Sequence, residues 1–265
     1  MYAHLPDPHL RQFVSHYWLS RNNSAPHFSV LPDGCVDLVL ALHGGQWHAL
    51  LYGTTTAPVT IALAPGYDYL GICFRPGQAR HFFTAPAGAL TNTALPAAAL
   101  TRFPLSRLAE QIGETEAGAV DVFQRLDNAL LDQLRHDCPL PTRLDKALRQ
   151  LSQPWEAPLC SRTAPPRQVA SLAADTGISV RQLQRLFHEA VGVSPKTLSA
   201  IQRVRWTARQ LAADTAHRIP LAALAYSAGY SDQSHMNRDC VRLLGVTPAQ
   251  LRRPDVAFVQ VPDPS

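Results

Sequence analysis

Three polar residues in the C-terminal half, Arg181, Gln184 and Arg185, have the spacing i, i+3, i+4. In a helix this spacing places the three side chains on one face. The apolar side chains of the same segment fall on a separate stripe, formed by Leu183, Leu186 and Phe187. Arginine can bond the O6 and N7 atoms of guanine, and glutamine the N6 and N7 atoms of adenine. The segment therefore has the groups needed to read base edges, although a solvated helix face would have the same pattern in isolation.

The same arrangement occurs a second time further along the chain. Gly177-Ile178-Ser179 matches Gly229-Tyr230-Ser231, and Gly192-Val193-Ser194-Pro195 matches Gly245-Val246-Thr247-Pro248. Each copy predicts a helix, a turn at a glycine and a second helix. The polar face of the later copy consists of Gln233, Ser234, Asn237 and Arg238. Because both faces occur in the same setting, we favour DNA contact by helices at about 180–190 and 233–243 over chance similarity.

The residues around each polar face indicate how the helices begin and end. Gly177 suits a left-handed helix end, and Ser179 can cap the helix that follows. Ser194-Pro195 begins a helix that continues to about Ala213, roughly 25–30 Å at ~1.5 Å per residue. A stiff helix of that length would hold the two reading helices about one DNA turn apart, ~34 Å. Its basic side chains could contact phosphates or simply be solvated; they are Arg203, Arg205 and Arg209.

The two halves of the 265-residue chain differ in charge. Most of the 24 basic residues lie in residues 142–265, while residues 1–141 have a small acidic excess. This asymmetry favours a polyanion partner for one domain only. A charged fraction of 17% and a hydrophobic fraction of 46% argue against disorder. Five widely spaced cysteines without a CxxC pair argue against a disulfide framework or a zinc finger. With no signal peptide or membrane-spanning apolar run, we expect a soluble cytoplasmic protein.

The first 90 residues are strand-like, with short apolar runs such as residues 36–42 and 70–74 between turn formers. After residue 104 the apolar side chains recur at three- and four-residue steps, which predicts an amphipathic helix. The apolar stripe of this helix could pack on the strands or on a second copy of the chain. It consists of Val120, Phe123, Leu126, Leu130, Leu131 and Leu134. A helix at about 142–151 then precedes a proline-rich stretch, residues 153–158, which we expect to be a loop.

These patterns predict an α+β fold class. The N-terminal domain, residues 1–140, is a small β-barrel or sandwich with accessory helices. Residues 141–167 hold a helix and a proline-rich linker, and residues 168–253 form an all-α domain of two helix-turn-helix units joined by a long helix. Residues 254–265 contain three prolines and are expected to be an irregular tail.

The paired units resemble the DNA-binding domain of AraC/XylS-type transcriptional regulators. The resemblance is carried by residues 228–238 with Gly245-Val246-Thr247-Pro248, and by residues 179–187, and it covers about 168–253. It implies seven helices, two reading helices on a rigid connector, and binding to promoter DNA. The base- and backbone-contacting positions it implies are Arg181, Gln184, Arg185, Gln233, Ser234, Asn237 and Arg238. Cys240 stands where the family usually has an aromatic residue, which predicts looser packing or a redox-sensitive thiol; we favour an inert buried cysteine.

The N-terminal region resembles, more weakly, the β-rich domains that precede this DNA-binding domain in some regulators. In the wider family such domains bind a small effector or mediate dimerisation. Asp37 lies inside an apolar run, where a buried carboxylate needs a partner, and Arg75 is a natural candidate. We expect Trp18, Asp37 and Arg75 to line an effector pocket, although a structural ion pair would also explain the charges. RNA polymerase, an unidentified effector and a second copy of the chain are further candidate partners.

Metal and catalytic sites are weaker alternatives. Cys35, Cys73 and His27 could meet in three dimensions and would suit zinc or copper(I). We nevertheless expect buried cysteines and a surface histidine, with no metal and no cofactor. The sequence alone leaves open a redox or metal role for Cys35, Cys73 or Cys240. No glycine-rich phosphate loop, GxSxG or HExxH motif is present. We therefore expect no enzyme, and keep as alternatives a catalytic N-terminal domain carried on a DNA-binding domain, or an effector-independent DNA-binding module.

Overall fold

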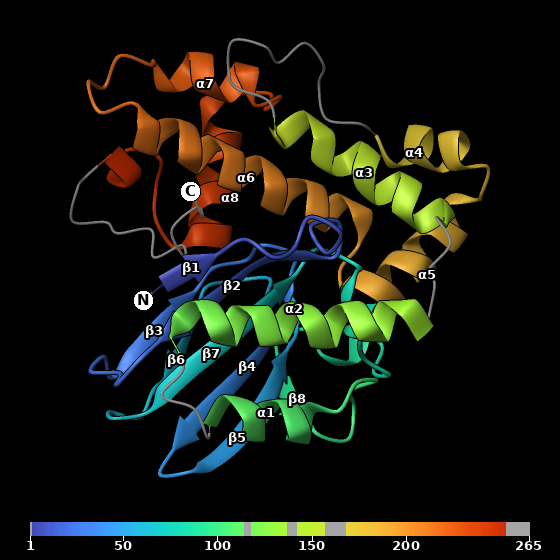
Figure 1. Cartoon of the computed structure of the whole chain (residues 1–265). Coiled ribbons are helices and arrows are strands. Elements are labelled where there is room, and N and C mark those ends of the chain that lie inside the picture. The colour runs from blue at the N-terminus through green and yellow to red at the C-terminus, as the bar shows by residue number, and fades with distance from the viewer. Residues whose placement is uncertain (1, 114–117, 137–141, 157–167, 253–265) are drawn as a thin grey trace.

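The computed structural model describes residues 2–113, 118–136, 142–156 and 168–252. Strands occupy the first part of the chain and helices the second (Figure 1), so the predicted fold class is confirmed. Residues 157–167 of the predicted linker segment (141–167) and the whole predicted tail (254–265) lie outside the described residues. None of the described helices is both long enough and apolar enough to cross a membrane.

In the described part of the N-terminal domain, eight strands form two antiparallel sheets. Their bounds are β1 Tyr2–His4, β2 Val14–Ser20, β3 His27–Val30, β4 Val36–His43, β5 Gln46–Tyr52, β6 Val59–Ala62, β7 Asp68–Phe74 and β8 Ala94–Pro96. The larger sheet has the order β1-β2-β7-β4-β5-β8, and β3 pairs with β6 in the smaller one. Gly44 and Gly45 both have positive φ, which allows the two-residue turn between β4 and β5 to follow the twist of the strands.

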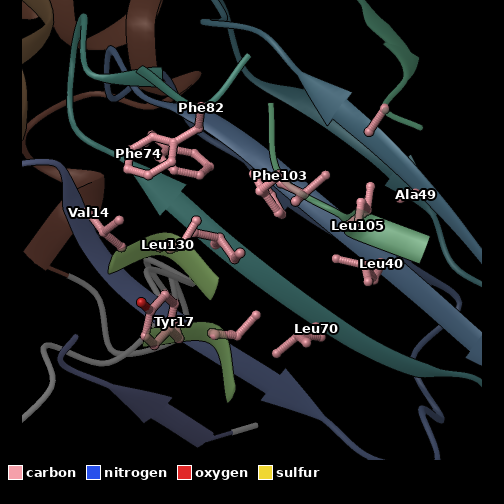
Figure 2. Packing of buried hydrophobic residues seen from close by; sticks show 14 of the residues in the cluster. Val14, Tyr17, Leu40, Ala49, Leu70, Phe74, Phe82, Phe103, Leu105 and Leu130 are labelled. Atoms are coloured by element: carbon pink, nitrogen blue, oxygen red, sulfur yellow. The ribbon is translucent and has the colours of Figure 1, made fainter. Parts of the chain in front are cut away.

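One face of the large sheet carries the apolar core. Because side chains alternate along a strand, Tyr17, Leu40, Leu70 and Phe74 point to the same side, and Figure 2 shows them converging with Leu130. Leu130 belongs to α2 (Ala119–His136), which covers this face together with α1 (Leu105–Gly113). The amphipathic helix therefore packs on the sheet of its own chain.

The position of the α2 stripe differs slightly from the prediction. Val120 is 72% exposed, and Val122 is buried in its place beside Phe123. A polar contact also fixes this helix, since the Tyr17 hydroxyl donates to Asp127 Oδ1 at 2.8 Å. Periodicity alone does not fix where a buried stripe begins near a helix end, and here it begins two residues later than predicted.

Six α-helices make up the described part of the C-terminal half. They are α3 Arg143–Glu156, α4 Val169–Thr176, α5 Val180–Val191, α6 Pro195–Ala213, α7 Leu221–Ser227 and α8 Gln233–Leu244, and a 3-10 helix, Gln250–Arg252, follows. They enclose two apolar clusters, one among α3, α4, α5 and the start of α6, and one among the rest of α6, α7 and α8. Helix α6 belongs to both clusters and so connects the two units.

Helix α3 is longer than predicted. It continues past Leu151 to Glu156 and contains Pro154, whereas the proline-rich stretch was expected to be a loop. Proline lacks the N–H for one helical hydrogen bond, but its φ is compatible with a helix, and near the C-terminal end few hydrogen bonds depend on it. The prediction of a loop beginning at residue 153 is wrong for this reason.

Candidate nucleic-acid interface

Helix α5 begins and ends where the sequence predicts. The Ser179 hydroxyl accepts from the backbone N–H of Gln182, and the Gln182 side chain accepts from the backbone N–H of Ser179, so both residues satisfy free donors at the helix start. Gly177 has φ +67° before it, and Gly192 has φ +87° at its C-terminal end. These local contacts fix the axis of the helix and therefore the direction of its polar face.

The polar face of α5 points away from the core. Arg181, Gln184 and Arg185 are exposed. Leu183 and Phe187 are fully buried in the first apolar cluster. The three predicted contact residues are thus presented together by a helix that is anchored on its opposite side, as reading a groove requires.

Helix α8 presents its polar residues in a similar way. Asp232 is the N-cap and accepts from the backbone N–H of His235 at 2.7 Å. This hydrogen bond lowers the pKa of Asp232. Gln233, Ser234 and Arg238 are exposed, so three of the four predicted residues of this face are accessible.

Asn237 differs from its three neighbours on α8. Its side chain is half-buried, and its Oδ1 atom is buried with no hydrogen-bond partner among the described residues. A buried oxygen without a hydrogen-bond donor is costly, so this atom differs from the solvated groups of its neighbours. Sequence spacing placed Asn237 on the polar face but did not reveal that it lies at the margin of the buried face.

Two arginines of α6 have internal roles that neither alternative anticipated. Arg203 donates to Asp239 Oδ2 of α8 at 2.8 Å, and its guanidinium lies 4.0 Å above the Tyr230 ring. Arg205 lies 3.4 Å from Asp33 Oδ2 of the N-terminal domain. Both arginines therefore join parts of the protein, a role that neither the phosphate-contact nor the solvated-surface interpretation included.

Cys240, which stands where the family usually has an aromatic residue, lies inside the core. Cys240 is fully buried beside Met236 and Leu243 in the second apolar cluster. Burial raises the pKa of its thiol to about 12, so the reactive thiolate is scarce at neutral pH. The structure favours the inert buried cysteine over the redox-sensitive alternative.

A cavity of about 1300 Å³ separates the two sheets and extends to α6. Trp18, Asp37 and Arg75 all line it, as do Gln202 and Arg205 of α6. The sequence did not predict that Gln202 and Arg205 line this cavity, because a helical pattern does not indicate which polar face of a helix contacts another domain. The cavity thus touches both the N-terminal sheets and the helix that connects the two reading helices; in Figure 1, α6 runs along this domain.

The predicted pair between Asp37 and Arg75 does not form. Arg75 is exposed and its Nε donates to the backbone oxygen of Arg11 at 2.6 Å. Asp37 instead lies opposite Cys73 on the neighbouring strand. Burial, together with the negative charge of Asp33, raises the pKa of Asp37 well above its ordinary value. The two residues share a cavity wall without forming an ion pair.

Comparisons with known proteins match two separate parts of the chain. Residues 2–96 match a family described as a domain of unknown function (DUF6597), and residues 172–254 match a helix-turn-helix domain family. A putative AraC-like transcription regulator of Streptomyces antibioticus is 36% identical over 85 residues. The C-terminal domain is of the AraC/XylS type. The AraC/XylS resemblance on residues 168–253 is therefore confirmed, and with it a DNA-binding helix-turn-helix domain.

The relatives of this AraC/XylS-type domain are matched over only a small part of their length. The alignment covers 32% of this chain and 27% of the Streptomyces protein. A probable bifunctional transcriptional activator/DNA repair enzyme AlkA of Mycobacterium tuberculosis is 41% identical over 85 residues, 16% of its length. The structure of ToxT from Vibrio cholerae aligns over 88% of this chain and 97% of its own, with 9% identity and a TM-score of 0.40. A score of that size does not establish a common fold.

Proposed function

We propose that this chain is a sequence-specific transcription regulator that binds promoter DNA through α5 and α8 and responds to a small effector through its N-terminal domain. The observation that carries the proposal is the pair of capped helices whose polar faces point outward from one shared connector, α6. RNA polymerase and a second copy of the chain are the further partners in this proposal.

The dimensions of α6 support simultaneous binding of two grooves. Its 19 residues correspond to ~28 Å at ~1.5 Å per residue. Successive major grooves on one face of a duplex are ~34 Å apart. A connector of this length, with a reading helix at either side, would allow Arg185 and Arg238 to reach base edges in neighbouring grooves.

The cavity supports control by a small molecule. Its volume of about 1300 Å³ suffices for an organic ligand, and its wall includes Gln202 and Arg205 of α6. A ligand that contacted both the sheets and α6 would bias the position of the connector relative to the N-terminal domain. That differential contact is the physical requirement for coupling effector binding to DNA binding.

The test is selection of duplexes from a random library by the full-length protein, followed by footprinting of the selected sites. We expect two protected patches about one helical turn apart on one face. Arg185→Ala and Arg238→Ala should each relax preference in one patch, at ~1–3 kcal/mol per lost base contact. Arg107→Ala on α1, an exposed arginine outside the reading faces, is the matched control.

The same experiment can overturn the proposal. Full sequence preference in the Arg185→Ala/Arg238→Ala double variant would remove the assignment of the reading faces. An affinity that did not fall with salt would argue against a nucleic-acid partner altogether, because phosphate contacts release counterions. A thermal-shift screen of metabolites against the full chain tests the effector half separately.

A further inference from the structure

Two cysteines far apart in the sequence meet beside a carboxylate in the wall of the cavity. One ligand atom from each of Asp33, Cys35 and Cys73 lies within 4.8 Å of the others. Cys73 is buried, while Asp33 and Cys35 are partly accessible from the cavity that all three residues line. This cluster is separate from the reading faces of α5 and α8, and the proposed function does not use it.

The pairing of β4 and β7 accounts for the cluster. Asp37 of β4 lies directly opposite Cys73 of β7. Cys35 lies just before β4, two residues from Asp37, and its thiol comes within 4.8 Å of the Cys73 thiol. Asp33 is in the preceding turn, where its Oδ1 accepts from the backbone N–H of Cys35 at 2.8 Å. That hydrogen bond holds the carboxylate over the two thiols.

We propose that Asp33, Cys35 and Cys73 form a binding site for Zn²⁺ in the cavity wall. Zinc accepts thiolate and carboxylate ligands together, whereas magnesium and calcium prefer oxygen and copper(I) prefers sulfur. Bonds of ~2.0–2.3 Å in a tetrahedron place neighbouring ligand atoms ~3.5 Å apart, so the three groups need to approach by only about 1 Å. On binding, each thiol releases its proton to solvent.

The charges near the cluster favour a dication. Two thiolates and the Asp33 carboxylate carry three negative charges. A zinc ion and the Arg205 guanidinium, which lies 3.4 Å from Asp33 Oδ2, together neutralise them. Arg205 belongs to α6, so the same site contacts the connector between the two reading helices. Zinc binding would therefore act on the same carboxylate that contacts α6.

The experiment uses the full-length protein, reduced and stripped with a chelator, and titrates zinc against a chromophoric competitor. We expect one zinc per chain. Cobalt as a probe should give a thiolate-to-cobalt charge-transfer band that zinc abolishes. Cys35→Ser should weaken binding at least tenfold, and so should Asp33→Asn. Asp33→Asn is the safer variant, because the amide oxygen can still accept from the Cys35 N–H and keep the turn.

Control variants separate this site from the other thiols. Cys240→Ala, and the double variant Cys138→Ser/Cys160→Ser at two positions outside the described residues, should bind zinc as the wild type does. The proposal is wrong if the freshly reduced protein takes up no zinc. It is also wrong if Cys35→Ser and Asp33→Asn leave the stoichiometry and affinity unchanged. Neither result depends on DNA binding, so the outcome is independent of the proposed regulatory function.

Discussion

The Thr54 hydroxyl of the N-terminal domain donates to the backbone oxygen of Val191, the last residue of α5, at 2.7 Å. The carbonyls of a final helical turn have no partner within the helix. Thr91 completes a second such contact by donating to the Gly192 oxygen at 2.7 Å. The N-terminal domain thus satisfies the end of the first reading helix and fixes its position.

Replacing Thr54 by valine should destabilise the protein by ~1–3 kcal/mol, because the shape is kept while a buried carbonyl loses its donor. Urea denaturation of the full chain measures the free energy of unfolding. Thr84→Val is the matched control, since the exposed Thr84 hydroxyl donates to Leu100 within the N-terminal domain. Equal losses in the two variants would contradict the special role of the contact with α5.

A second contact between the domains should make stability depend on acid pH. Arg80 donates to Asp145 Oδ1 of α3 at 2.6 Å. Burial alone would raise the pKa of Asp145, but the hydrogen bonds from the Thr142 hydroxyl and from Arg80 outweigh it, and the pKa lies well below its ordinary value. The contribution to stability is therefore present above about pH 4, the ordinary carboxyl range, and is lost as the pH falls further.

Asp145→Asn should lower the free energy of unfolding at pH 7 by ~1–2 kcal/mol and flatten its decline below about pH 4. Denaturant titrations across that pH range provide the measurement. Asp68→Asn, which removes the more exposed pair with Arg21, is the control and should cost less than ~1 kcal/mol. If the free energy of unfolding of Asp145→Asn declined below about pH 4 as steeply as that of the wild type, protonation of Asp145 would not be coupled to unfolding.

The contact between Arg203 and Asp239 gives a prediction that separates stability from DNA binding. Both side chains are largely buried, and Arg203→Met leaves Asp239 with the more exposed Arg242 at 2.9 Å. Breaking a buried pair by removing one partner should cost ~2–4 kcal/mol. Thermal unfolding should register this loss, while the salt dependence of DNA affinity stays unchanged. A salt slope reduced by about one with normal stability would instead identify Arg203 as a phosphate contact.

Sequence reasoning succeeds where the determining contacts are local. Gly177 ends α4, Ser179 begins α5 and Ser194-Pro195 begins α6, each through contacts with residues at most a few positions away. The same holds for the outward direction of Arg185, because the 3.6-residue period assigns it opposite Leu183 and Phe187. The capped, polar-faced helices were therefore predictable from spacing alone.

It fails where a polar side chain meets a distant segment. Arg205 and Asp33 are far apart in the sequence, and no periodicity indicates that their domains face each other. Likewise, the register between β4 and β7 decides that Asp37 lies opposite Cys73 and not beside Arg75. A shift of one residue would reverse the face of every side chain on the strand. Cross-strand and cross-domain partners therefore needed coordinates.

Gly71 is also constrained by a residue that is distant in the sequence, the Trp18 indole in the cavity wall. Gly71 of β7 pairs with Trp18 of β2, and a Cβ atom added to it would lie 2.0 Å from the indole ring. Gly71→Ala must therefore displace the indole from the sheet and disturb its stacking on Phe28 of β3, at 6.2 Å between ring centroids. We expect a loss of ~1–3 kcal/mol, measured by denaturant unfolding, with altered tryptophan fluorescence.

The double variant Trp18→Ala/Gly71→Ala decides whether this clash is the cause. Once the indole is removed, the added methyl group has room, so the second substitution should cost much less than it does in the wild type. The two effects should then be strongly non-additive. Additive effects would mean that Gly71 is required by the backbone of β7 and not by the indole. In that case the position of the Trp18 indole in the cavity wall would not depend on the absence of a side chain at residue 71.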